Sequence, residues 1–192
     1  MTISTTIFET PGPHNTQRTV ELAVAAAREL GIKTVLAASC TGFVADTLLQ
    51  QDLTGLSPVI VSHAYGFLAD GENELPSDKR RHYESLGVPV CTAAHPLSGA
   101  ERSLSNAFGG AYPVEVMAHT LRLFGQGTKV CVEACAIAAD AGVIVPGQSI
   151  VAIGGTGHGA DTALVLRPAH TNRLLRTRLD YFICKPLRPL ED

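Results

Sequence analysis

The sequence predicts an α/β fold in which a mainly parallel sheet is covered by helices on both faces to make three layers. Short apolar runs of strand length alternate with amphipathic segments of helix length, and this alternation is typical of α/β proteins. The 192 residues are 45% apolar, which is enough for one core that buries roughly 70% of the unfolded surface. No change of composition indicates a second core, so we expect residues 1–192 to form a single domain.

The first half of the chain alternates helices and strands. Apolar residues on one helical stripe predict a helix over residues 16–30, with Asn15 as its N-cap and Gly31 beyond its last turn. The predicted elements that follow are a strand over 33–38, a helix over 43–50, a strand over 59–62, a helix over 77–86 and a strand over 88–92. This order favours parallel pairing of the three strands.

The second half of the chain is helical before it returns to strands. Helices are predicted over 98–108, 113–124 and 128–141, with Pro113 in a first turn and Gly142 after the last helix. A strand over 149–153 enters a glycine-rich loop, and a further strand is predicted over 161–166. A last strand is expected over 174–184, where alternating charges indicate an edge, and the tail after Lys185 should lie over the surface. We expect some antiparallel strands near this C-terminus.

Charge balance and apolar content exclude several classes of protein. Lys and Arg total 15 against 18 for Asp and Glu, a net charge of -3, whereas nucleic-acid-binding domains are normally basic. No apolar run reaches the roughly 18 residues of a membrane helix, and the N-terminus lacks the pattern of a secretory signal. Five scattered cysteines with no Cys-x-x-Cys pair indicate reduced thiols. We therefore expect a cytoplasmic protein that binds neither nucleic acid nor membrane.

Small polar residues follow the four clearest strands. The carboxyl ends of parallel strands lie along one edge of a sheet, where ligands bind, so we expect these loops to converge. A turn between a strand and a helix can offer a hydroxyl and main-chain N–H groups to an anion such as phosphate, although ordinary turn and capping chemistry explains the first turn equally well. The ligand contacts expected at these strand ends are Ser39, Thr41, Gly42, His63, Thr92 and Ser98.

The glycine-rich loop over 154–159 does not match a dinucleotide-binding fingerprint. Its glycine spacing differs, and a strand follows it where the fingerprint needs a helix. Either the loop is a tight hairpin connection, or it is a main-chain nest that binds phosphate through Gly155, Thr156 and Gly157. Asp161 and Thr162 either cap this loop or contact the ligand.

His63 and His95 are the candidates for acid or base catalysis, because each follows a predicted strand and would face the crevice. The alternative for each is a histidine whose hydrogen bonds are satisfied by the loop main chain. No metal site is expected, since the chain has neither a His-x-x-x-His pair nor a Cys and His cluster. Cys40 and Cys91 lie next to the crevice and are interpreted as small core thiols.

Two cations are candidates for contact with an anion. Lys129 and Glu133 are four residues apart on an apolar helix, with Asp140 on roughly the same face, and this spacing favours a structural ion pair. Arg102 lies in the first turn of a predicted helix that Ser98 can cap, from where its guanidinium can reach an anion. If the crevice holds phosphate, we expect Arg102 and Lys129 to contact it.

Several motifs resemble those of one protein family. They are His95-Pro96-Leu97-Ser98-Gly99-Ala100-Glu101-Arg102, Phe108-Gly109-Gly110-Ala111-Tyr112-Pro113-Val114-Glu115, Phe124-Gly125-Gln126-Gly127 and the segment 155–163. Together with the helix, strand and turn of residues 19–45, they are similar to stand-alone proteins that resemble the C-terminal α/β domain of pyruvate kinase. The similarity covers nearly the whole chain.

The resemblance implies a fold and a ligand class rather than a reaction. The kinase barrel has no counterpart, so the phosphoenolpyruvate site is absent. The corresponding kinase domain binds a phosphorylated effector, and the stand-alone proteins are associated with flavin mononucleotide, which the motif over 155–162 is expected to help hold. The phosphate-loop turn of the kinase matches Ser39, Thr41 and Gly42. The chain differs from the family pattern in carrying Cys40 and His158 in these loops.

We therefore expect a protein that binds a phosphate-bearing nucleotide, flavin mononucleotide, at the carboxyl edge of its sheet. Whether it is an enzyme stays open, and flavin redox chemistry with His63 or His95 supplying a proton is the simplest reaction. The alternatives are a non-catalytic sensor or regulatory module for a phosphorylated metabolite, and a structural domain whose loops only make turns. The apolar helices over 113–141 also predict a homo-oligomer.

Overall fold

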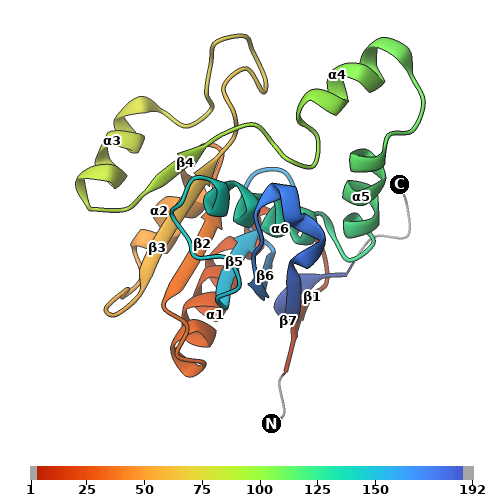
Figure 1. The fold of residues 1–192 in the computed structure, drawn as a ribbon. Helices are drawn as coiled ribbons and strands as arrows, with labels where there is room; N and C mark the ends of the chain where they lie inside the picture. Colours follow the sequence, from red (N-terminus) through yellow and green to blue (C-terminus); the bar gives the residue numbers. More distant parts are fainter. Residues whose placement is uncertain (1–3, 188–192) are drawn as a thin grey trace.

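The computed structural model describes residues 4–187, which form one seven-stranded sheet with helices on both faces (Figure 1). The strands are β1 (Thr6–Phe8), β2 (Thr34–Ala38), β3 (Ser57–Ser62), β4 (Val90–Thr92), β5 (Ile150–Gly154), β6 (Thr162–Arg167) and β7 (Arg178–Pro186). The helices are α1 (Thr16–Glu29), α2 (Phe43–Leu49), α3 (Ser77–Ser85), α4 (Gly99–Phe108), α5 (Pro113–Arg122) and α6 (Gln126–Asp140). Two 3₁₀ helices are η1 (Pro13–Asn15) and η2 (Thr171–Arg176). The helices and strands predicted between residues 16 and 166 are confirmed.

Four strands form the parallel half of the sheet, in the spatial order β5-β2-β3-β4. β2 is parallel to both β3 and β5, and β3 is parallel to β4. The chain thus moves outward from β2 to β4 and returns through α4, α5 and α6 to add β5 on the other side of β2. The order of the strands reverses between β2 and β5, and such a switch point is where open α/β sheets bind ligands.

The other half of the sheet contains the antiparallel pairs expected near the C-terminus, and β1 adds a parallel pair with β7. β6 is antiparallel to both β5 and β7. The prediction of a strand over 174–184 is partly wrong, because η2 ends at Arg176 and β7 begins only at Arg178. The edge predicted from the alternating charges is present at residues 178–180, because β1 pairs only with Cys184, Lys185 and Pro186 of β7. β1 has 3 residues, too few to show a strand period in the sequence. β7 also takes in the start of the tail predicted after Lys185, and residues 188–192 lie outside the described residues.

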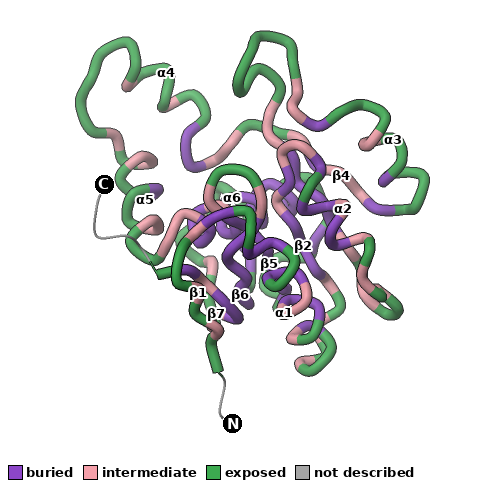
Figure 2. Tube along the Cα trace, turned by 180° about the vertical axis from the view of Figure 1, so that it is seen from behind, coloured by how far each residue is buried: buried purple, intermediate pink, exposed green. Residues whose placement is uncertain are grey.

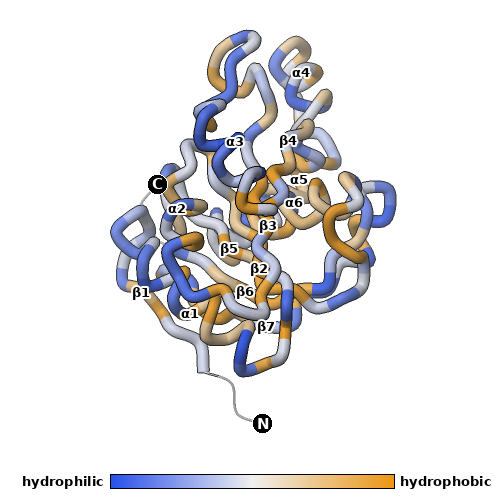
Figure 3. Tube along the Cα trace, turned by 90° about the vertical axis from the view of Figure 1, so that its left-hand side faces the viewer, coloured by the Kyte–Doolittle hydropathy of each residue, from blue (hydrophilic) through white to orange (hydrophobic). Residues whose placement is uncertain are grey.

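Alternate residues of the central strands enter two separate cores. In β2, Val35 and Ala37 belong to the core under α1 and α2, whereas Leu36 belongs to the core under α6. This division follows from the two-residue period of a strand, and burial on both faces requires the continuous apolar run that β2 has. Buried segments fill the centre of the molecule in Figure 2, and hydrophobic residues concentrate on the same strands in Figure 3. The expected three layers are therefore confirmed.

Helix α6 is almost wholly buried and covers the sheet behind the carboxyl edge of the strands. Apolar and small residues occur on all its sides, which is the pattern of a helix enclosed by protein. Its first turn comes very close to β6, because a Cβ added at Gly127 would lie 2.2 Å from Thr162 Oγ1. α5 packs against α6, and α4 extends beyond it (Figure 1).

Two predicted N-caps occupy their positions without the expected side-chain bond. Asn15 precedes α1, but its Nδ2 donates to the Thr10 carbonyl oxygen at 2.8 Å and its side chain makes no capping bond. Ser98 precedes α4, also without a side-chain capping bond. After α1, Gly31 has a φ of +66°, the left-handed conformation that ends many helices.

Candidate functional site

A cavity of about 280 Å³ lies at the carboxyl edge of the parallel strands. Its walls come from the loop after β2, the end of β3, the loop after β5 and the face of α6. Phe67, Arg102 and Gly157 are its exposed members. The structure thus brings separate strand ends together, as the sequence predicts. The predicted site residues that line the cavity are Ser39, His63, His95, Arg102, Lys129, Gly155 and Gly157.

Three cationic side chains line the cavity. Arg102 lies over the Phe67 ring, with its guanidinium carbon 5.9 Å from the ring centroid. Arg122 ends α5, and its Nε donates to Gln126 Oε1 at 2.7 Å. The third cation, Lys129, is paired with Glu133, which is the one acidic side chain among the lining residues. Because Glu133 balances Lys129, Arg102 adds positive charge to the cavity wall, and this charge attracts anions.

Lys129 and Glu133 form the ion pair that their spacing predicts, and the pair is buried. The two residues are 5% and 6% exposed. Lys129 Nζ donates to Glu133 Oε2, while Glu133 Oε1 accepts the main-chain N–H of Leu97 at 2.9 Å. Burial lowers the pKa of the Lys129 ammonium, and the charge of Glu133 opposes this effect. Asp140 is not part of the pair, because it accepts a hydrogen bond from His170 Nδ1 at 2.9 Å.

His63, Phe67 and His95 form a cluster of rings at one side of the cavity. Their centroids are 4.1 to 5.2 Å apart. His63 Nδ1 donates to Glu74 Oε2, and because an ionised carboxylate only accepts, Nδ1 carries the hydrogen. This pair orients the His63 ring and leaves Nε2 as the nitrogen that can meet a ligand.

His95 combines a place in the cavity wall with a hydrogen bond to the main chain. Its Nε2 accepts the N–H of Ala64 at 3.4 Å, so Nδ1 carries the hydrogen of the neutral ring. Burial lowers the pKa of His95, and this effect exceeds the opposite effect of the Glu133 charge. An imidazole that is neutral near pH 7 can accept a proton, as a general base must.

The turn after β2 lines the cavity with Ser39 and Cys40 and packs against α3 at Gly42. Ser39 Oγ accepts the N–H of Ala45 at 3.2 Å, which is capping chemistry for α2. Thr41 and Gly42 do not line the cavity. Gly42 has a φ of +93°, and an added Cβ would lie 2.7 Å from the Tyr83 hydroxyl. This glycine is therefore required by the backbone and by its packing against α3, and the capping interpretation accounts for the turn.

The glycine-rich loop is the hairpin between the antiparallel strands β5 and β6, and it also lines the cavity. Two of its amides are already used, because Thr156 N–H donates to Asp161 Oδ2 at 3.2 Å and Ala160 N–H donates to Thr16 Oγ1 at 2.9 Å. Among the residues 4–187, the main-chain N–H groups of residues 157–159 have no acceptor. These three are the amides that a ligand can use.

Asp161 and Thr162 stabilise this loop and do not line the cavity. Both are fully buried. The Asp161 carboxylate accepts the N–H of Gly12 at 3.1 Å and the hydroxyl of Thr162 at 2.8 Å, in addition to the Thr156 amide. Of the two interpretations for these residues, the structure supports loop capping.

Thr92 and Ser98 also lie outside the cavity lining. The Thr92 hydroxyl accepts from the Arg80 guanidinium and lies 2.5 Å from Ser62 Oγ. Ser98 is buried at the start of α4, where its N–H donates to the His95 carbonyl oxygen at 3.1 Å. Both residues therefore support the loop that carries His95.

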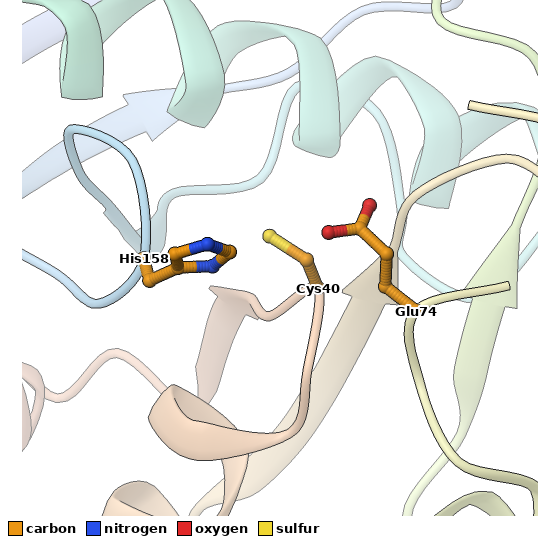
Figure 4. Close-up of side chains that lie close together, drawn as sticks. All are labelled: Cys40, Glu74 and His158. Atoms are coloured by element: carbon orange, nitrogen blue, oxygen red, sulfur yellow. The ribbon is translucent and has the colours of Figure 1, made fainter. Parts of the chain in front are cut away.

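Sequence reasoning missed several residues of this region. Gln126 belongs to the Phe124 to Gly127 motif that the sequence analysis singled out and Arg122 lies two residues before it, so that motif was a usable signal. Glu74 lies in a long loop and gave no signal. Glu74 lies close to two residues from distant loops, Cys40 and His158. The Cys40 sulfur, a Glu74 carboxylate oxygen and a His158 ring nitrogen all lie within 4.8 Å of one another (Figure 4). Burial and the charge of Glu74 raise the pKa of the Cys40 thiol.

Comparison with known proteins agrees with the fold. The sequence model of the family described as pyruvate kinase, alpha/beta domain, matches residues 17–166 of the 192-residue chain. The chain belongs to this family. The region shared with the pyruvate kinase alpha/beta domain runs from α1 to β6, so it contains the strand ends that line the cavity. None of the helices formed by residues 4–187 has the length and apolarity needed to cross a membrane.

Proposed function

We propose that this domain binds a small molecule with a phosphate group in the cavity at the carboxyl edge of its sheet. The observation that supports this most directly is the Arg102 guanidinium, which lines the cavity beside the charge-balanced pair of Lys129 and Glu133. Guanidinium groups pair with phosphate oxygens through parallel hydrogen bonds. The N–H groups of Gly157 and Gly159, which also line the cavity, add main-chain donors.

Flavin mononucleotide is the ligand that we propose from the family resemblance. Its phosphate suits the two arginines, and the Phe67 ring with its histidine neighbours suits an aromatic ring system. The cavity of about 280 Å³ is just below the range of roughly 300–1,000 Å³ usual for drug-sized ligands. Part of a bound flavin would therefore lie outside the cavity. A bound flavin supplies reversible electron and hydride transfer.

If the protein catalyses a reaction, His95 is the residue that we propose as its proton acceptor, with Nε2 giving up its 3.4 Å hydrogen bond from the Ala64 N–H to accept the proton. It lines the cavity, and its lowered pKa keeps the ring neutral near pH 7. His63 is the second candidate, because it lines the cavity and Glu74 orients its ring.

The size of the cavity favours a second candidate function, a non-catalytic sensor for a phosphorylated metabolite. A sugar phosphate is smaller than a flavin nucleotide and fits within about 280 Å³. A sensor needs only binding and a change passed to a partner, so it requires neither histidine to titrate.

Calorimetric titration with four probes tests both candidates. The probes are flavin mononucleotide, riboflavin, inorganic phosphate and ribose 5-phosphate. Flavin mononucleotide should bind about ten- to hundredfold more tightly than riboflavin, because charge-assisted hydrogen bonds contribute about 1.5–3 kcal/mol each. Binding of ribose 5-phosphate without the flavin would favour the sensor. If no phosphate-bearing probe binds, the proposed function is wrong.

A matched pair of variants locates the phosphate. Arg102→Gln removes a guanidinium from the cavity, while Arg81→Gln removes one from the exposed face of α3, outside the lining. Arg102→Gln should weaken the phosphate probe about tenfold or more, whereas Arg81→Gln should not. If both variants weaken phosphate binding equally, the net charge of the protein, and not a contact with Arg102, determines the affinity.

Self-association through α5 remains part of the proposal. An apolar groove of about 340 Å³ lies between α5, η2 and β7, and Leu175 on its rim is 82% exposed. Light scattering should therefore show a species larger than the 20.2 kDa monomer, and Leu175→Glu should shift it toward the monomer. The five cysteines are free thiols, which supports the proposed cytoplasmic location.

A further inference from the structure

Cys40, Glu74 and His158 meet beside the cavity from three loops that are far apart in the sequence. The Cys40 sulfur, a Glu74 carboxylate oxygen and a His158 ring nitrogen all lie within 4.8 Å of one another. Figure 4 shows the thiol between the imidazole and the carboxylate. We propose that these three side chains bind one divalent transition-metal ion of the zinc class.

The donor atoms suit zinc rather than magnesium or calcium. Zinc is bound by thiolate at about 2.3 Å, by imidazole at about 2.0–2.1 Å and by carboxylate at about 2.0–2.2 Å. Magnesium and calcium take oxygen ligands, so a mixed set of sulfur, nitrogen and oxygen disfavours them. Tetrahedral binding needs sulfur and nitrogen roughly 3.5 Å apart. Rotation of the exposed His158 side chain can provide this approach.

Glu74 is held in place by contacts of the kind that orient metal ligands. His63 Nδ1 donates to Glu74 Oε2. The neighbouring Asn73 ties this segment to the end of β3, because its Nδ2 donates to the His63 carbonyl oxygen at 2.7 Å and its Oδ1 accepts the Leu75 N–H at 2.9 Å. Such outer contacts fix a carboxylate ligand and tune the bound metal.

The other two residues also project from fixed segments. Cys40 follows β2 directly, where the N–H of Ser39 donates to the Val61 carbonyl oxygen at 2.9 Å. The loop that carries His158 is held at both ends by the bonds of Thr156 and Ala160 described above. The backbone of the cluster is therefore set before a metal arrives, and only side chains need to move.

Charge also favours a cation here. A Cys40 thiolate would lie next to the Glu74 carboxylate in a half-buried position. On binding, the divalent ion forms a bond to the Cys40 sulfur, and the thiol proton is released to solvent. Three protein ligands leave a fourth position open, and because Cys40 lines the cavity, a ligand oxygen there can occupy it. The metal site goes beyond the proposed anion site and does not depend on it.

Titration with Co²⁺ in the absence of phosphate tests the site. The protein is stripped with a chelator, kept reduced and titrated with Co²⁺ while absorption is recorded. We expect one Co²⁺ per chain, a thiolate-to-cobalt band in the near ultraviolet and displacement by Zn²⁺. A chain that takes up no Co²⁺ at one equivalent would overturn the proposal. Because phosphate is omitted, this failure is distinct from failure of anion binding.

Variants with matched controls identify the ligands. Cys40→Ser should abolish the near-ultraviolet band, whereas Cys91→Ser, a buried thiol on β4, should keep it. Loss of an outer contact weakens metal binding by roughly 10- to 100-fold. The Co²⁺ affinity of His63→Ala should fall by a factor in this range, and that of His158→Ala should fall by more. His119→Ala, an exposed histidine on α5, should have no effect.

The exposed position of His158 keeps the test decisive even if Cys40→Ser does not fold. A band that persists in Cys40→Ser would place the bound ion elsewhere. Equal affinities of His158→Ala and His119→Ala would overturn the assignment in the same way.

Discussion

Replacing Lys129 with methionine removes one partner of a buried ion pair and leaves the Glu133 carboxylate in a site that is 6% exposed. Methionine fills most of the space of the lysine stem, so the change acts mainly on charge. Removing one partner of a buried pair costs about 3–5 kcal/mol of unfolding free energy. Unfolding entropy of about 2.1 cal/mol/K per residue gives roughly 0.4 kcal/mol/K for 192 residues. The melting temperature should therefore fall by roughly 7–12 °C.

A second change in the same chain separates charge from packing. In Lys129→Met with Glu133→Gln, the glutamine Oε1 can still accept the Leu97 N–H that Glu133 Oε1 accepts at 2.9 Å. The uncompensated charge is gone, so the double variant should recover about 2 kcal/mol or more of the loss. Urea unfolding at pH 7, followed by circular dichroism, measures both variants. A single variant that loses less than about 1 kcal/mol, as exposed pairs do, would refute the reasoning, as would a double variant no more stable than the single one.

Three further measurements probe other parts of the molecule. The pKa of His95 lies below its ordinary value of 6.5 because the ring is buried. As the pH falls, His95 is therefore protonated in the unfolded chain before it is protonated in the folded protein. Urea unfolding should show that the free energy of unfolding declines below about pH 6.5, and that it declines less in His95→Gln. The same dependence of stability on pH in both proteins would contradict this. Gly42→Ala meets the Tyr83 hydroxyl, whereas Gly31→Ala, also at positive φ, meets nothing within 4 Å. Gly31→Ala should lower the free energy of unfolding by about 1–2 kcal/mol, and Gly42→Ala should lower it clearly more. Equal losses of stability in the two variants would argue against the contact with Tyr83. Cys40 is the one half-buried thiol, so Ellman's reagent should label it first, and labelling of all thiols at one rate would be unexpected.

The central helices and strands could be predicted because each leaves a local pattern. β2 is a continuous apolar run, α1 has a glycine directly after its last turn, and α6 is apolar on all sides. β1 and the start of β7 could not be predicted, because 3 residues show no period and η2 depends on contacts with α6. The short pairing of β1 with the end of β7 could not be predicted either, since β1 comes from the other end of the chain.

The candidate site also contains one contact that the sequence could predict and others that it could not. The ion pair of Lys129 and Glu133 has a helical spacing of four residues, so the sequence alone was sufficient to predict it. The pairing of His63 with Glu74 and the cluster of Cys40, Glu74 and His158 join residues from separate loops. No local spacing encodes such contacts.

Taken by itself, the sequence determined the layered α/β architecture and the edge of the sheet where a ligand would bind, because both follow from strand periods and parallel order. Only the tertiary structure decided which polar residues face the cavity. It turned Gly42, Asp161 and Thr162 toward structural hydrogen bonds and packing, left Thr41 outside the cavity lining, and brought in Arg122 and Phe67. The physical reason is that a side chain's direction and partners depend on how distant segments pack against it.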